Sequence, residues 1–169
     1  MSVVLSRVRP EDAAILKQVR LAALLDTPSA FGSTYASEAM WTDEQWTRRA
    51  IHTSAGRDSA TFLAWIEGRP AGIAGGYRPD NAVDDVELVS MWTAPDARRS
   101  GVGALLVRAV VEWAIENDSS SIGLWVTRGN DPAIALYESL GFRETGDYQP
   151  LPSDPCKDEL RMARRLGDR

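Results

Sequence analysis

The sequence has little of the chemistry that disulfide scaffolds and metal centres need. Its 169 residues include one cysteine, Cys156, and one histidine, His52. A single thiol excludes an intrachain disulfide, and such scarcity is typical of a reducing, cytoplasmic setting. His52 has no second histidine with which to bind a metal ion, so we expect no metal site.

Long apolar runs and an excess of positive charge are also missing. The most apolar stretch, 102–115, is interrupted by Arg108 and Glu112 and is too short to cross a bilayer. Residues 1–12 lack the apolar core of a signal peptide. The net charge of −5 argues against a nucleic-acid partner and mildly favours a cationic one such as an amine, although surface acidity usually serves solubility. We therefore expect neither a membrane nor a nucleic acid as partner.

What the sequence does contain is a regular succession of hydrophobic patterns, over a length that suits a single domain, 1–169. The order strand, two helices, three strands, helix, strand, helix, two strands predicts an α/β (α+β) fold, a mixed sheet with helices on its faces. The first predicted elements are a strand at 3–8, a helix opened by Pro10 with Ile15, Val19 and Ala22–Ala23 on one face, a mixed segment at 29–40, and a helix from the capping box Thr42–Gln45 to about Ile51. The later ones are strands at 60–66, 71–77 and 84–93, a helix from Val102, a strand at 122–126, a helix from Pro132, a strand from Phe142 and a strand near 159–164.

Three of these elements carry sharper expectations. The strand at 84–93 has apolar residues on both faces, so we expect it in the middle of the sheet. A proline-rich loop, with Pro150, Pro152 and Pro155, is expected before the last strand. The helix from Val102 is the clearest element, and its apolar stripe is Val102, Leu105, Leu106, Ala109, Val110, Trp113 and Ala114.

The segment Arg98–Gly103 follows a predicted strand and opens that helix. Helix N-termini expose unpaired backbone N–H groups and the positive end of the helix dipole. Gly101 and Gly103 have no Cβ to keep a phosphate from the backbone, and the two arginines add positive charge. We expect a pyrophosphate site here, and the alternative is a tight turn with close helix packing. A P-loop lysine and the third glycine of a dinucleotide-binding loop are both missing.

Two segments resemble the signatures of the GNAT superfamily of N-acetyltransferases, and the resemblance covers nearly the whole chain. The loop signature [RQ]-x-x-G-x-[GA] is met by Arg98, Gly101 and Gly103. The second signature, N-x-x-A-x-x-x-Y-x-x-x-G-F, is met by Asn130, Ala133, Tyr137, Gly141 and Phe142. The resemblance implies acetyl transfer from acetyl-CoA to a primary amine without a metal. It also implies a mostly antiparallel sheet of six to seven strands with about four helices, and a V-shaped opening between the strand that ends at Thr93 and the strand at 122–126.

The reaction needs a base for the attacking ammonium, donors for the oxyanion and an acid for the leaving thiolate. The candidates are the Glu87 carboxylate as base, the backbone N–H of Met91 or Trp92 at a bulge as oxyanion donor, and the Tyr137 phenol as acid. The alternatives are a solvent-edge strand residue for Glu87 and a core aromatic for Tyr137. Asn130 binds the cofactor or the loop, or simply caps a helix. The residues expected at the cofactor are Met91, Trp92, Thr93, Arg98, Arg99, Ser100, Gly101, Val102, Gly103, Ala104, Asn130, Ala133 and Tyr137.

For the acceptor, the resemblance implies the first helices and the loop between the last two strands, here 22–46 and 146–157. Their side chains form either an aromatic, mildly acidic pocket for a cationic amine or the packing of a long loop. The candidates are Phe31, Tyr35, Glu38, Trp41 and Tyr148. The leading hypothesis is an enzyme for a small-molecule amine. The alternatives are an acetyltransferase for protein lysine or N-terminal amines and a non-catalytic acyl-CoA-binding module. A homodimer is also implied by the resemblance.

Overall fold

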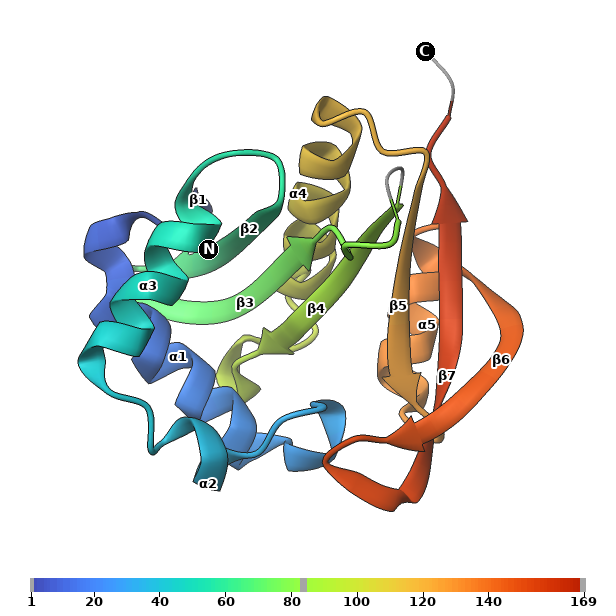
Figure 1. Cartoon of the computed structure of the whole chain (residues 1–169), viewed down its shortest axis with the longest axis horizontal. Helices are drawn as coiled ribbons and strands as arrows, with labels where there is room; N and C mark the ends of the chain where they lie inside the picture. The colour runs from blue at the N-terminus through green and yellow to red at the C-terminus, as the bar shows by residue number, and fades with distance from the viewer. Residues whose placement is uncertain (1, 83–84, 168–169) are drawn as a thin grey trace.

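The computed structural model describes residues 2–82 and 85–167, and one sheet of seven strands organises it (Figure 1). The strands are β1 (Val3–Arg7), β2 (Ser59–Ile66), β3 (Arg69–Tyr77), β4 (Asp85–Thr93), β5 (Ser121–Thr127), β6 (Arg143–Leu151) and β7 (Asp154–Arg165). The helices are α1 (Ala13–Asp26), α2 (Tyr35–Glu38), α3 (Asp43–Ser54), α4 (Val102–Glu116) and α5 (Asp131–Ser139), with short 3-10 turns η1 (Pro10–Asp12), η2 (Pro28–Ala30) and η3 (Pro95–Ala97). The predicted order of elements is confirmed, and the short α2 is one helix more than the four expected.

The sheet runs in the order β1-β2-β3-β4-β5-β7-β6, so β4 lies in its middle, as predicted. Neighbouring strands are antiparallel except for β4 and β5, which are parallel, and the sheet is therefore mixed and mostly antiparallel. The start expected for β4, Asp84, lies outside the described residues. Parallel neighbours need a crossover, which α4 supplies between them.

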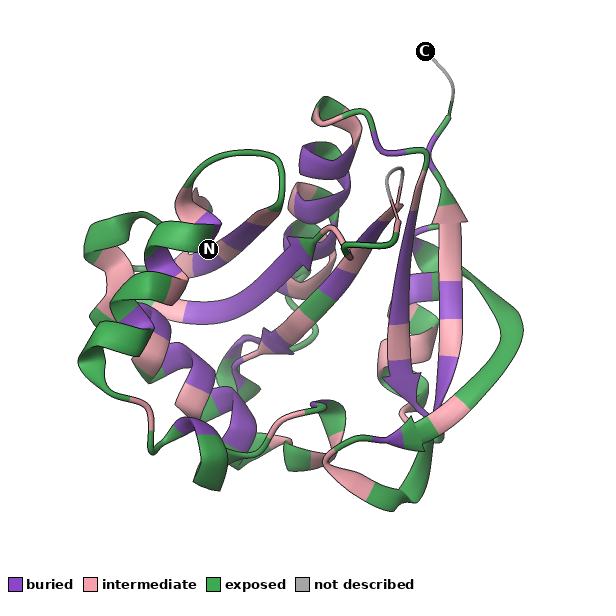
Figure 2. Cartoon of the chain, viewed as in Figure 1, coloured by how far each residue is buried: buried purple, intermediate pink, exposed green. Residues whose placement is uncertain are grey.

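Helices cover both faces of the sheet. In Figure 1, α1 and α3 lie in front of the sheet, and α4 and α5 lie behind it. Glycines let α4 approach β3 closely, since a Cβ on Gly72 would lie 2.8 Å from Leu106 Cδ1 and one on Gly76 would lie 2.8 Å from Val110 Cγ1. Buried residues accordingly run along β3, β5 and α4, whereas the edge strand β6 is exposed over most of its length (Figure 2). The described residues include no helix that is long and apolar enough to span a membrane.

The structure corrects the predicted faces of two helices. On α4, Leu105 is 37% exposed and the buried positions are Val102, Leu106, Val107, Val110, Val111, Trp113 and Ala114. On α1, Ala22 is exposed and Ile15 only half-buried, and the buried positions are Leu16, Val19, Arg20, Ala23 and Leu24. Both helices are rotated about their axes relative to the prediction, because several neighbouring apolar rows could have faced the sheet.

The structure also corrects the proline-rich loop. Pro150 lies in β6 and Pro155 lies in β7, so the segment 146–157 is a hairpin with a short turn rather than a long loop. Strand β6 is an edge strand, and β7 at Pro155 extends beyond its pairing with β5, so neither proline removes a hydrogen bond from a central ladder. The capping box at Thr42 and Gln45 is confirmed, and Trp46 of the same helix packs inward and is 1% exposed.

Candidate active site

Strands β4 and β5 part soon after they begin. Their ladder holds three rungs, from Asp85 with Ser121 to Glu87 with Gly123, and β5 offers β4 no partner beyond that point. Figure 1 shows the two strands diverging toward their C-terminal ends. The predicted opening between the strand that ends at Thr93 and its neighbour is therefore present. One edge of β4, from Leu88 on, has no strand beside it and can take up an extended ligand.

A β-bulge lies within this free stretch of β4. Gly75 pairs with Val89 and Ile73 pairs with Trp92, so Ser90 and Met91 together oppose one residue of β3. Ser90 has a φ of +58°, which places a residue with a side chain in the left-handed region. The bulge that the oxyanion hypothesis requires is thus present at the expected residues, and it turns the backbone of Met91 relative to a regular strand.

The loop from Arg98 to Gly103 joins this strand to α4 and has the features of a tight turn. Gly101 is the N-cap of α4 with a φ of +87°, and no side chain caps the helix there. A Cβ on Gly103 would lie 3.1 Å from Met91 Cε and 3.2 Å from Leu136 Cδ2, so the start of α4 packs against the bulge and against α5. The loop is therefore a tight turn with close helix packing, the alternative given above. The same turn leaves the first N–H groups of α4, at Val102, Gly103 and Ala104, without helical partners.

Arg98 braces the loop against β4 and α1 from the protein surface. Its Nε donates to the carbonyl oxygen of Thr93 at 3.1 Å, and its guanidinium forms an ion pair with Asp26 at the end of α1. Asp26 Oδ2 also accepts a hydrogen bond from Trp92 Nε1 at 2.9 Å. The sequence did not predict this role of Asp26, because an aspartate at the end of a helix has no distinctive pattern. Arg99 and Ser100 are exposed beside the start of α4, so Arg99 is the loop cation that faces solvent.

Glu87 and Arg161 form an ion pair at the closed end of the opening. Arg161 Nη1 lies 2.6 Å from Glu87 Oε2, its Nη2 contacts Oε1, and the two side chains are 20% and 14% exposed. The guanidinium reaches from β7 across β5, and it passes over Gly123, where a Cβ would lie 2.6 Å from its Cζ. The hydrogen bonds that Arg161 donates to Glu87 raise the pKa of Arg161, and burial together with the nearby Glu87 charge raises the pKa of Tyr77. Glu87 is thus a partly buried, ion-paired carboxylate.

Tyr137 lies on α5, next to the Leu136 side chain that meets Gly103. The ring is 6% exposed and contacts Phe142 edge-on, with centroids 5.9 Å apart. Burial raises the pKa of its phenol, which keeps the hydroxyl protonated at neutral pH and makes it a weaker acid than an exposed tyrosine. Asn130 caps α5 by accepting the N–H of Ala133 at 3.4 Å, as the cap alternative expected.

The five acceptor candidates are divided between core and surface. Phe31 is 4% exposed and Glu38 3%, while Trp41 packs on Trp46 with ring centroids 4.9 Å apart. Tyr35 is 39% and Tyr148 50% exposed. Glu38 forms ion pairs with Arg20 at 2.7 Å and Arg49 at 3.3 Å, so its charge is neutralised inside the protein and supplies no acidic lining.

A short segment closes the open end of the parted strands on the α1 face. We call residues 26–32 the strap, since they run from the end of β4 to the end of β5 and on to the β6–β7 turn (Figure 1). Hydrogen bonds hold it at three places. Trp92 Nε1 donates to Asp26 Oδ2 at 2.9 Å, Thr127 Oγ1 donates to the Ser29 carbonyl at 2.5 Å, and Ser153 Oγ donates to the Phe31 carbonyl. Gly32 meets Pro152 as well, at 3.6 Å from an added Cβ. The strap thus links the ends of β4 and β5 to the β6–β7 turn.

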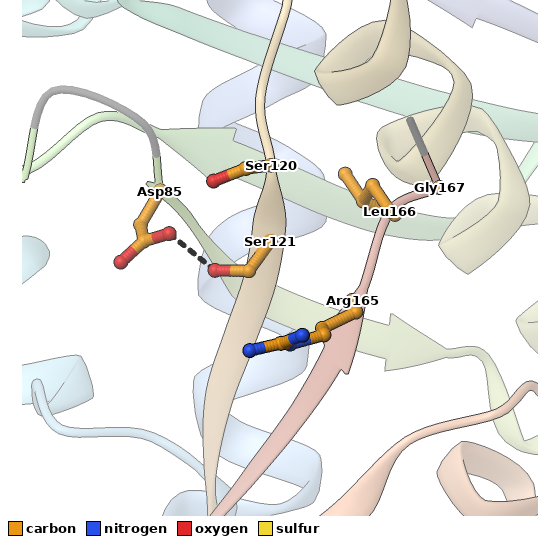
Figure 3. Close-up of a pocket in the computed structure, with 6 residues that line it drawn as sticks. All are labelled: Asp85, Ser120, Ser121, Arg165, Leu166 and Gly167. Carbon is orange, nitrogen blue, oxygen red and sulfur yellow. Dashed lines mark hydrogen bonds between the residues drawn. The ribbon is translucent and has the colours of Figure 1, made fainter. Parts of the chain in front are cut away.

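A pocket of about 420 Å³ lies at the other end of β4 and β5, where the strands begin (Figure 3). In it, Ser121 Oγ donates to Asp85, and Arg165 points inward from β7. This pocket is remote from the α4 N-terminus and from the bulge, so it lacks the groups that acyl transfer from a phosphorylated donor needs. The described residues also hold no cluster of three or more histidine, cysteine or carboxylate side chains suited to a metal ion.

Comparison with known proteins identifies the class. The family model of the acetyltransferase (GNAT) family matches residues 21–142. The chain is 27% identical to the [ribosomal protein bS18]-alanine N-acetyltransferase of Escherichia coli over 141 residues, which is 82% of this chain and 90% of that protein.

Solved structures share the fold. The protein yncA of Salmonella typhimurium, solved with its cofactor acetyl-CoA, superposes with a TM-score of 0.80 at 16% identity, over 100% of this chain and 96% of that one. Spermidine N-acetyltransferase from Vibrio cholerae, solved with CoA and spermine, superposes with a TM-score of 0.76 at 15% identity, over 96% and 95%. The chain therefore belongs to the GNAT family, and it is an acetyl-CoA-dependent N-acetyltransferase.

Proposed function

We propose that this acetyltransferase moves the acetyl group of acetyl-CoA to the primary amine of a small molecule, by direct attack in a ternary complex. The observation that carries the proposal is the parting of β4 and β5 beyond Glu87, with a bulge at Ser90 on the free edge and the uncapped start of α4 beside it. Strand β4 thus offers an extended edge and a turned backbone amide, and the start of α4 offers unpaired N–H groups. These groups suit a thioester on a long phosphorylated carrier.

The residues that bind the donor follow from this arrangement. The N–H groups of Val102, Gly103 and Ala104 hold the pyrophosphate, because they lie at the positive end of the helix dipole without helical partners. Arg99 adds charge from the solvent side, and Arg98 acts as a brace between β4 and α1. The free edge of β4 pairs with the pantetheine arm, as a peptide strand would.

The reaction forms one carbon–nitrogen bond and breaks one carbon–sulfur bond, and each proton transfer is assigned to a group. The amine nitrogen bonds to the thioester carbon, the carbon–sulfur bond breaks, and the oxyanion in between accepts the backbone N–H of Met91 or Trp92. A proton leaves the ammonium for Glu87, directly or through a water, and the thiolate takes a proton from Tyr137 as the carbon–sulfur bond breaks. The nitrogen releases a second proton as the amide forms, and this proton returns to the Tyr137 phenolate, directly or through water. Deprotonating an alkylammonium with a pKa near 10.4 costs about 4 kcal/mol at pH 7.5. The Glu87 carboxylate, fixed at the closed end of the opening, assists this step by accepting the proton. Arg161 holds that carboxylate in one orientation through the ion pair.

The strap supports a small acceptor. It joins the ends of β4 and β5 on the α1 face and meets the β6–β7 turn, so a folded protein surface has no open path to the thioester from that side. A flexible protein N-terminus is the second candidate acceptor. It is favoured by the similarity to the bS18-alanine N-acetyltransferase, which extends over most of both chains.

Thermal unfolding with acetyl-CoA tests the donor site, with NAD and ATP as controls. For a dissociation constant of about 10 μM, 1 mM ligand stabilises the folded state by about 2.7 kcal/mol, which raises Tm by about 5–11 °C. Release of free CoA thiol is then followed with a panel of polyamines, amino acids and amine antibiotics, and with short peptides bearing a free N-terminus. Turnover with peptides alone would replace the small-molecule acceptor by the protein one, and binding without any turnover would favour the acyl-CoA-binding module.

We also propose that residues 1–169 act as one domain, in the cytoplasm and as a homodimer. Light scattering tests the dimer, and a monomer in solution would refute it.

A further inference from the structure

Helix α1 carries an arginine into the interior. Arg20 is charged but only 6% exposed, because it lies among the buried residues of α1. Its Nε and Nη2 donate to the two oxygens of Glu38 at 2.9 and 2.7 Å, and its guanidinium lies 4.9 Å above the Phe31 ring. Buried charges persist in proteins when they are paired and hydrogen-bonded, and Glu38 provides both the opposite charge and the hydrogen-bond acceptors for Arg20. The pair holds the guanidinium in one place.

The remaining end of this guanidinium reaches the bulge. Arg20 Nη1 donates to Ser90 Oγ at 3.2 Å. Ser90 is the bulge residue with the φ of +58°, a conformation that a serine adopts only when its surroundings hold it there. The hydrogen bond joins residues 70 positions apart, so it fixes the bulge from an element outside the sheet.

A second tie from the same helix lies on the other side of Met91. Asp26 accepts the indole N–H of Trp92 at 2.9 Å and also pairs with Arg98. Helix α1 therefore holds Ser90 before Met91 and Trp92 after it. The two backbone N–H groups proposed above as donors to the oxyanion are those of Met91 and Trp92, and both belong to residues inside or beside this clamp.

We propose that Arg20, held by Glu38, is a positioning residue that fixes the β4 bulge and thereby aims the backbone N–H of Met91 or Trp92 at the thioester carbonyl. This role rests on the proposed function. Arg20 touches neither the donor nor the acceptor in it. Glu38, expected from sequence to line an acceptor pocket, instead orients this arginine.

The carbonyl itself can report the role. Acetyl-CoA labelled with ¹³C at the thioester carbonyl is bound to each variant, and the NMR shift of the bound carbonyl is compared with that of free ligand. A hydrogen bond to the carbonyl oxygen polarises it and moves the resonance downfield. In Ser90→Ala, which leaves the Arg20–Glu38 pair intact, and in Arg20→Met, we expect the bound resonance to move back toward the free value.

Turnover separates positioning from binding. With the amine found in the panel, kcat is expected to fall about 10- to 100-fold in both variants, the scale for a weakened oxyanion donor, while the KM for acetyl-CoA changes less than about threefold. Lys17→Met is the matched control. Lys17 lies on α1 as Arg20 does, but its ion pair with Asp43 is exposed to solvent, so its loss should change neither kcat nor the KM for acetyl-CoA.

Two failures are distinguishable. If the wild type does not bind acetyl-CoA, both the proposed function and the role of Arg20 are overturned. If the wild type shows the carbonyl shift, and Ser90→Ala and Arg20→Met retain it together with the wild-type kcat, only the role of Arg20 is overturned.

Discussion

Gly123 is the position at which one added methyl group tests the ion pair at the closed end of the opening. An alanine Cβ there would lie 2.6 Å from Arg161 Cζ and closer still to Nη2, so the guanidinium must leave Glu87. The two side chains are only 20% and 14% exposed, so both charges would lose a partner in a poorly solvated place. We expect Gly123→Ala to lower the free energy of unfolding by about 2 kcal/mol, within the range for hydrogen bonds to charged groups. Tm should fall by about 4–8 °C in a calorimetric scan.

A double-mutant cycle isolates the cause. In an Arg161→Met background the clash with the guanidinium is gone, so Gly123→Ala should cost less than about 0.5 kcal/mol. Gly32→Ala serves as the control, because its added Cβ meets Pro152 at an ordinary 3.6 Å. An equal loss of stability from Gly123→Ala in both backgrounds would show that Arg161 is not what the glycine accommodates, and the argument for the ion pair would fail.

Three further predictions concern other parts of the site. Tyr137→Phe keeps the ring on Phe142 but removes the phenol, so kcat for thiol release should fall about 100-fold with Tm nearly unchanged; an unaltered kcat would remove Tyr137 from the chemistry. For Glu38, burial raises the pKa, but hydrogen bonding to Arg20 and the charges of Arg20 and Arg49 outweigh it and hold the pKa below its usual range. The carboxylate therefore stabilises the fold at neutral pH and loses this effect as pH falls below about 4. Glu38→Gln should cost about 3–5 kcal/mol at pH 7, and in urea titrations the difference should shrink toward pH 3; a constant difference would contradict the pairing. Gly101→Ala meets no atom within 4 Å but must adopt a φ of +87°, so it should cost about 1–2 kcal/mol, while Gly167→Ala, in open space without a positive φ, should cost nothing measurable in the same denaturant series.

Local patterns predicted much of this molecule correctly. The capping box at Thr42, the central place of β4 and the start of α4 after Gly101 all depend on residues within a few positions of one another. The core-aromatic alternative for Tyr137 also describes its packing, since the residue is 6% exposed. These features follow from backbone propensity and side-chain spacing, which a single stretch of chain contains in full.

Errors arose where distant elements decide. The buried face of α4 includes Val107 and excludes Leu105, because the sheet surface selects one of several apolar rows. Pro150 and Pro155 lie in strands, because β6 borders solvent and the end of β7 has one open edge. Local rules treat a proline as a break, but pairing geometry decides whether its missing N–H matters.

The sequence by itself determined the order of elements, the family, and the loop Arg98–Gly103 that leads into α4. Only the tertiary structure decided which charged side chains form ion pairs with one another. Arg98 braces β4 through Asp26, and Glu87 is held by Arg161 from 74 positions away. An ion pair depends on where two backbones place their side chains in space, and separation along the chain carries no information about that distance. The same holds for the bulge at Ser90, since its register exists only once β3 has paired with β4.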